Sequence, residues 1–116
     1  MNIMNFTKTI LHNLLKKPIT RPYPSTPRIY EERTRGHIRI EIKDCIFCGI
    51  CSRKCPPAII SVNRAERIWE IQPLGCIQCG ACVENCPVKC LFMMQTYTDP
   101  DTFKRVDRFQ QEVKKQ

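Results

Sequence analysis

Eight of the nine cysteines stand in two runs of identical spacing, C-x-x-C-x-x-C-x-x-x-C-P. The runs are Cys45, Cys48, Cys51, Cys55 with Pro56, and Cys76, Cys79, Cys82, Cys86 with Pro87. Three cysteines at steps of three can place three thiolates on three irons of a cubic cluster, and the fourth iron needs a thiolate from elsewhere in the chain. The spacing therefore predicts two [4Fe–4S] clusters.

The fourth cysteine of each run is expected to ligate the cluster of the other run, as it does in chains that carry two such runs. The proline after it fixes φ and turns the chain away. The expected ligands are Cys45, Cys48, Cys51 and Cys86 for one cluster, and Cys76, Cys79, Cys82 and Cys55 for the other. Gly49 and Gly80, which lack a Cβ, would let the backbone approach the clusters and donate hydrogen bonds to sulfur.

Zinc and disulfides are the competing explanations for these cysteines. Structural zinc is typically bound by separated C-x-x-C pairs, and it has no use for a third cysteine in step or a proline after the fourth. A disulfide framework needs an oxidising compartment, and nine cysteines leave one unpaired. The repeated spacing favours iron–sulfur clusters, with a zinc-binding module as the alternative that metal analysis would separate.

Positive charge gathers in the N-terminal third of the chain. The formal net charge is +8, and residues 1–43 hold nine Lys or Arg against three acids. An anionic membrane surface or an acidic partner could use this charge. Nucleic acid is not expected as a partner, because no recognition motif or aromatic platform accompanies the charge. We find no signal peptide and no apolar run long enough to span a bilayer, which predicts a cytoplasmic location.

Residues 3–17 are predicted to form an amphipathic helix that ends before Pro18. Its apolar face would contain Ile3, Met4, Phe6, Ile10, Leu11, Leu14 and Leu15, and His12 lies on the polar face. We expect this face to dock on a membrane-embedded partner or lie at the membrane interface, the alternative being an ordinary helix packed on its own domain. Residues 18–30 combine four prolines with Tyr23, Tyr30 and two arginines, which favours an extended docking strap over a flexible linker.

The two cysteine runs form an internal repeat, because Cys76 and Cys86 follow Cys45 and Cys55 by 31 residues. We expect strands over 38–42, 59–62, 67–71 and 91–94, a turn over 63–66, and brief helices after Cys51 and Cys82. The first strand should pair with the last. The predicted fold is an α+β, pseudo-twofold arrangement of short antiparallel strand pairs closed around two clusters.

Several single residues are expected to be structural. Cys90 and Trp69 are predicted to be buried packing residues, and His37 is predicted to lie at the surface or an interface. Beyond the clusters, Thr98–Asp101 is expected to form a turn and possible N-cap before a short docking helix that begins at Phe103, with Phe103, Val106 and Val113 near one face and Phe109 somewhat off it. We find no nucleophile–base pair, phosphate loop or open metal position, so no catalytic residue is predicted and the expected chemistry is electron transfer.

The cysteine pattern over residues 38–94 resembles the bacterial-type two-cluster ferredoxins. The helix ending at Pro18, the Arg21–Pro24 strap and the lead-in at Glu32–His37 resemble the two-cluster subunit shared by respiratory complex I and the membrane-bound energy-converting [NiFe] hydrogenases. Among these relatives, the short chain is most similar to the ferredoxin-type subunit of the Ech-type hydrogenases. It departs from them at Cys90, where relatives more often carry a small apolar residue.

This resemblance implies a docking arm over residues 1–37, a 2[4Fe–4S] ferredoxin domain over 38–95, and a docking helix and tail over 96–116. It implies a peripheral subunit on the cytoplasmic side of the cell membrane. There it would relay electrons from soluble reduced ferredoxin to the small subunit of a hydrogenase, beside the large and membrane subunits. The alternatives are the homologous subunit of a complex I-like quinone oxidoreductase and a soluble electron-carrier ferredoxin.

Overall fold

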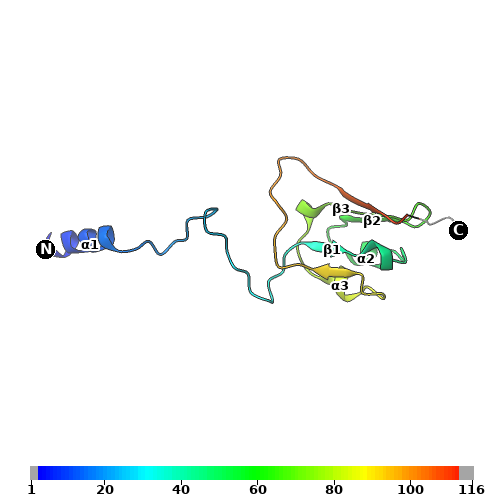
Figure 1. Cartoon of the computed structure of the whole chain (residues 1–116), viewed down its shortest axis with the longest axis horizontal. Coiled ribbons are helices and arrows are strands. Elements are labelled where there is room, and N and C mark those ends of the chain that lie inside the picture. Colours follow the sequence, from blue (N-terminus) through cyan, green and yellow to red (C-terminus); the bar gives the residue numbers. More distant parts are fainter. Residues whose placement is uncertain (1–2, 113–116) are drawn as a thin grey trace.

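The computed structural model describes residues 3–112, with side chains described from residue 6 onward. Ile3 and Met4 of the predicted apolar face, and Val113 of the predicted C-terminal helix, therefore lie outside the side chains that are described. The molecule is elongated, with extents of 83 × 28 × 25 Å, because the N-terminal helix stands well away from the folded domain (Figure 1).

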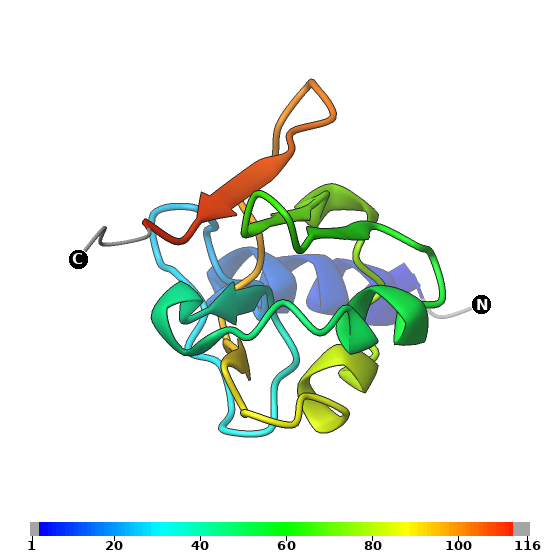
Figure 2. The same ribbon diagram turned by 90° about the vertical axis from the view of Figure 1, so that its right-hand side faces the viewer.

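The domain is built from two similar halves whose strands pair across the repeat. The first half contains β1 (Ile38–Ile40), α2 (Ile50–Lys54) and β2 (Ile60–Asn63), and the second contains β3 (Ile68–Ile71), α3 (Ala81–Glu84) and β4 (Leu91–Met93). β1 pairs antiparallel with β4, and β2 pairs antiparallel with β3. The predicted α+β class and the pairing of the first strand with the last are confirmed. Figure 2 shows the short helices α2 and α3 beside these strands.

Single turns of 3-10 helix precede the two cysteine runs. They are η1 (Ile42–Asp44) and η2 (Pro73–Gly75), which end against Cys45 and Cys76. The prediction that the first strand continues to Ile42 is wrong, because the chain leaves β1 after Ile40 to make the turn that delivers Cys45. The turn between β2 and β3 forms as predicted, with Asn63 Oδ1 accepting hydrogen bonds from the backbone N–H groups of Ala65 and Glu66.

The C-terminal segment is a strand, and the predicted helix over 103–109 is wrong. β5 (Asp107–Gln110) pairs antiparallel with β3 and makes a three-stranded sheet. Arg108 Nε binds Glu70 Oε1 at 2.7 Å across the pair, and the Phe109 ring lies 5.8 Å from that of Trp69. The edge of β3 supplies backbone hydrogen-bond partners and side-chain contacts from elsewhere in the chain, so the long-range pairing decides the conformation.

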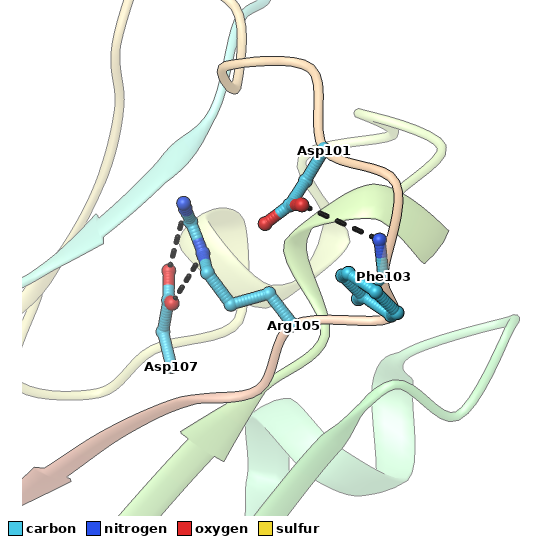
Figure 3. Close-up of polar contacts among 4 residues, drawn as sticks. All are labelled: Asp101, Phe103, Arg105 and Asp107. Carbon is cyan, nitrogen blue, oxygen red and sulfur yellow. Dashed lines mark hydrogen bonds and ion pairs between the residues drawn. The ribbon is translucent and has the colours of Figure 1, made fainter.

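The loop before β5 is held by local polar contacts (Figure 3). Asp101 Oδ1 accepts the backbone N–H of Phe103 at 3.3 Å, and the Arg105 guanidinium binds the Asp107 carboxylate at 2.8 Å. Asp101 therefore stabilises a turn, and no helix follows it up to residue 112, where the described structure ends. This loop borders an open cleft of about 580 Å³, whose lining includes Cys76, Gln78 and Arg105.

The buried core is small and lies where the two halves meet. It contains Ile40, Phe47, Ile60, Trp69, Ile71, Cys82, Cys90 and Leu91. Trp69 is 1 % exposed and Cys90 is 3 % exposed, which confirms both as buried packing residues. Such a core leaves little apolar area to hold the domain together without further groups inside it.

The N-terminal helix α1 (Ile3–Leu15) ends two residues earlier than predicted. Its described apolar side chains do not pack on the domain, because residues 6–29 are all exposed. Phe6, Leu14 and Leu15 are 71–80 % exposed. Residues 16–37 contain no helix or strand. Within the described residues, no helix is both long and apolar enough to cross a membrane.

The segment before β1 is fixed to the segment after β4. The backbone N–H of Gly36 donates to Met94 O at 2.7 Å, and that of His37 donates to Thr96 O at 2.9 Å. The His37 Nδ1–H also donates to the Thr96 carbonyl at 2.7 Å. The Tyr30 and Tyr97 rings meet edge-to-face, with centroids 5.3 Å apart. The arm is therefore anchored in the domain from Tyr30 onward.

We expect Gly36→Ala to weaken this attachment strongly. A Cβ at this position would clash with the backbone carbonyl of Thr96 and would lie 2.5 Å from Met94 O, so the two segments would have to separate. Overpacking of this kind typically costs about 1–3 kcal/mol. Hydrogen exchange at the amides of His37 and Met94 should become faster, because both amides donate hydrogen bonds between the two segments. Unchanged exchange in Gly36→Ala would contradict this account.

Candidate iron–sulfur site

The eight cysteines of the two runs occupy equivalent places in the two halves. Cys45 and Cys76 cap the 3-10 turns, Cys51 and Cys82 lie in α2 and α3, and Cys55 caps the end of α2. Cys48 and Cys79 lie in the loops just before these helices, and Cys86 follows α3. Regular elements therefore position three thiols of each run around one corner of the domain.

Two cavities of similar size, about 330 and 300 Å³ including their open mouths, divide the cysteines between them. The first cavity is lined by Cys45, Cys48, Cys51, Cys86 and Cys90. The second cavity is lined by Cys76, Cys79, Cys82 and Cys55. Each cavity thus contains three cysteines of one run and the fourth cysteine of the other, which is the grouping that crossed ligation requires.

Unusual backbone conformations recur at the same places in both halves. Three pairs of residues with positive φ lie 31 positions apart, namely Phe47 and Gln78, Gly49 and Gly80, and Ala58 and Lys89, while Arg67, just before β3, has positive φ without a counterpart. Non-glycine residues adopt such angles rarely and at a free-energy cost, which marks a functional constraint. One result is visible in the second run, where the backbone N–H of Gln78 donates to Cys76 Sγ at 3.4 Å. The positive φ at Gln78 thus accompanies a backbone N–H that points at a ligand sulfur.

Burial and hydrogen bonding shift the pKa values of the thiols in different directions. Burial raises the pKa of the Cys82 thiol to about 11, and burial also raises the pKa of Cys51. Burial likewise raises the pKa of Cys86, but hydrogen bonds from Cys90, Val88 and Lys89 outweigh it, and the net shift is downward. Because a metal ligand must be a thiolate, binding at the buried thiols would release protons.

The ninth cysteine lies beside the fourth ligand of the first cavity. Cys90 Sγ is 3.6 Å from Cys86 Sγ. Burial strongly raises the pKa of the Cys90 thiol, and the hydrogen bond with Cys86 raises it further. At the equivalent place in the second cavity stands Ile59. The sequence identified Cys90 as a packing residue but gave no sign that its sulfur would contact Cys86.

The side chains around both cavities fit an iron–sulfur cluster better than a single ion. Within residues 3–112, no three Cys, His, Asp or Glu side chains are close enough together to hold one metal ion. A cubane does not require that closeness, because each thiolate binds a different iron. The remaining lining is apolar and includes Ile46, Phe47 and Leu91 in the first cavity and Ile60 and Ile77 in the second, which limits water access.

Comparison with known proteins agrees with this chemistry. Residues 44–91 match the family model of the 4Fe-4S dicluster domain. This segment is therefore a dicluster ferredoxin domain that binds iron–sulfur clusters. It is homologous to subunit I of the quinone oxidoreductases described next.

Two curated relatives show the extent of the similarity. The chloroplastic NAD(P)H-quinone oxidoreductase subunit I of Chlorokybus atmophyticus is 38% identical over 60 residues, which are 52% of this chain and 31% of the relative. The NADH-quinone oxidoreductase subunit I 2 of Syntrophobacter fumaroxidans is 38% identical over 68 residues, which are 53% of this chain and 37% of the relative. The chain thus spans about a third of the length of these curated relatives.

A solved structure extends the similarity over most of the chain. A chain from the structure of the membrane-bound sulfane sulfur reductase, an archaeal respiratory membrane complex, superposes with a TM-score of 0.63 at 29% sequence identity. The superposition covers 82% of this chain and 53% of that chain. The similarity therefore reaches beyond the segment that contains the cysteine runs.

Proposed function

We propose that this dicluster ferredoxin domain is the electron-relay part of a subunit in a membrane-bound, complex I-like respiratory assembly. The observation that carries the proposal is the pair of cavities, each lined by the cysteines that a [4Fe–4S] cluster needs. When bound, two such clusters supply one-electron transfer and, with every iron coordinated by a cysteine, leave no position open for substrate. The ligands are proposed to be Cys45, Cys48, Cys51 and Cys86 for one cluster and Cys76, Cys79, Cys82 and Cys55 for the other.

The protein's own residues hold the clusters and shield them. The apolar lining of both cavities limits water access, and the backbone N–H of Gln78 donates to Cys76 Sγ. Both features are ways in which a protein adjusts the potential of an iron–sulfur cluster. The chain also offers an unpaired apolar face on α1, where Phe6, Leu11 and Leu14 are exposed. We propose that this face docks on another subunit and keeps the domain at the cytoplasmic side of the membrane.

For the assembly, we propose an energy-converting [NiFe] hydrogenase of the Ech type. In that assembly the domain would receive electrons from soluble reduced ferredoxin and deliver them to the hydrogenase small subunit. This proposal is supported by the similarity of the N-terminal helix and strap to the hydrogenase-associated subunits. The second candidate is a complex I-like quinone oxidoreductase, which the names of the two curated relatives favour.

Purification of the tagged protein from its native membrane distinguishes the two candidates. For the hydrogenase, we expect co-purified nickel in proportion to the chain and hydrogen production from reduced ferredoxin. For the quinone oxidoreductase, we expect quinone reduction without nickel. Recovery of the iron-loaded chain as a free monomer would contradict both and favour a soluble carrier. Zinc in place of iron would exclude electron relay altogether.

A further inference from the structure

The most deeply buried large side chain carries an N–H group that has no partner. Trp69 is 1 % exposed, and its indole Nε1 is the buried side-chain nitrogen or oxygen without a hydrogen-bond partner in the described part of the chain. Buried hydrogen-bond donors nearly always have an acceptor in a folded protein, because a donor that loses its water and gains no acceptor destabilises the fold. The unpartnered indole N–H of Trp69 therefore indicates an acceptor that becomes available when the protein holds its iron–sulfur clusters.

The neighbouring space identifies that acceptor as sulfur. Trp69 lines the first cavity together with Cys45, Cys48 and Cys51. Its N–H makes no hydrogen bond in this geometry, and Trp69 belongs to the buried core against which Cys45 and Cys51 pack, so the indole lies next to ligand sulfurs of this cavity. A thiolate at Cys51 would be the stronger acceptor, since hydrogen bonds to charged groups are shorter and stronger.

The second cavity has no equivalent donor. Its lining consists of cysteines and of Ile38, Pro57, Ile59, Ile60, Ile77 and Gly80, so none of its side chains bears an N–H. The pseudo-twofold relation that makes the two ligand sets equivalent is broken at this point. Among the side chains that line the two cavities, Trp69 alone bears an N–H, and the Arg35 guanidinium, which reaches Cys79, donates to its carbonyl oxygen at 3.1 Å.

We propose that the indole N–H of Trp69 donates to the Cys51 thiolate of the loaded domain and raises the reduction potential of the first-cavity cluster relative to the second. The reason is electrostatic: a hydrogen bond to a ligand sulfur stabilises the more negative, reduced state of the cluster. Trp69 is thus a tuning residue, and it makes two similar sites unequal. The inference rests on the proposed iron–sulfur function and is tested on the loaded protein.

The first test observes the indole directly. Trp69 is the one tryptophan of the chain, so protein grown with ¹⁵N-tryptophan has a single indole N–H resonance. In the iron-loaded protein we expect this resonance to be hyperfine-shifted, to change on reduction, and to exchange slowly with deuterium. An indole resonance at its ordinary position that is the same in both redox states would overturn the proposal. Iron analysis of the same sample shows separately whether the clusters are present.

The second test measures the potential. Trp69→Phe retains an aromatic ring and removes the N–H, so one of the two midpoints in an EPR redox titration should fall while the other remains. Phe109→Leu, which alters the packing against the same ring without touching the N–H, is the matched control and should leave both midpoints in place. Two unchanged midpoints in Trp69→Phe, or an equal shift in Phe109→Leu, would refute tuning by the indole. If Trp69→Phe fails to retain iron, the NMR test decides.

Discussion

Deleting residues 1–30 should release the domain from its assembly and leave its iron content unchanged. The deletion removes α1 and most of the exposed segment that follows it, and it stops before the hydrogen bonds of Gly36 and His37 that secure β1. All cysteines that line the two cavities lie beyond the deletion. The truncated protein should therefore bind as much iron as the full chain, yet appear in the soluble fraction.

The apolar face of α1 is large enough to account for this effect. Phe6, Ile10, Leu11, Leu14 and Leu15 are all at least half exposed. Full burial of such a side chain contributes about 1.5–3 kcal/mol, so the face could supply on the order of 10 kcal/mol before the costs of association are subtracted. Loss of the face should weaken docking by several orders of magnitude.

Adjacent substitutions on opposite faces of α1 provide the matched control. Leu14→Asp places a charge on the apolar face, whereas Asn13→Asp places the same charge on the polar face. Leu14→Asp should impair co-purification with the membrane assembly, and Asn13→Asp should not. Equal retention of both variants, or a truncated protein that still co-purifies, would show that α1 is not the docking element.

The second large effect concerns which cysteines belong to one cluster. Cys55→Ala should reduce the iron content from about eight to about four per chain, because each [4Fe–4S] cluster depends on four thiolates. If Cys55 and Cys79 serve the same cluster, as their shared cavity suggests, the double variant Cys55→Ala/Cys79→Ala should lose no more iron than the single variant. Cys55→Ala/Cys48→Ala should lose nearly all of it. The reverse pattern would show that each run holds its own cluster.

The reciprocal experiment needs one precaution. Cys90 Sγ lies 3.6 Å from Cys86 Sγ in the first cavity, so Cys86→Ala is best made together with Cys90→Ala, which removes the neighbouring thiol. Cys90→Ala alone should retain both clusters and serves as the control. The double variant should retain about four iron per chain, measured by iron analysis and by the remaining EPR signal.

The elements that the sequence predicted well are those fixed by local signals. The repeat of 31 residues anticipated the two equivalent halves, and the alternation of Ile38 and Ile40 anticipated β1 and its pairing with β4. The crossed ligation that the cysteine spacing predicts stays a prediction, and the two cavities group the cysteines in the way that it requires. In each case the chemistry of a short segment was enough to restrict its conformation.

The errors arose where distant contacts decided the outcome. Phe103 and Val106 stand at helical spacing, but residues 107–110 pair with the edge of β3 as a strand, and Glu70 pairs with Arg108 across it. Ile42 continues the alternation of β1, yet the chain turns there to bring Cys45 to the first cavity. The residues of these two segments give no indication of the partner strand or of the cavity.

The role proposed for Trp69 was hidden for a similar reason. A buried tryptophan is most often a packing residue, and composition cannot show whether its N–H has a partner. Only the fold shows that this donor borders the first cavity and that the second cavity lacks one. Two ligand sets that look equivalent in sequence are therefore unequal in their surroundings.

The 83 Å length of the molecule, with α1 at one extreme and both cavities at the other, separates two properties that many small redox proteins must reconcile on a single surface. The strength of docking on a partner subunit depends on one end of the molecule, and the reduction potentials of the clusters depend on the other. Substitutions in α1 can therefore adapt docking to a different partner subunit without changing the reduction potentials of the clusters.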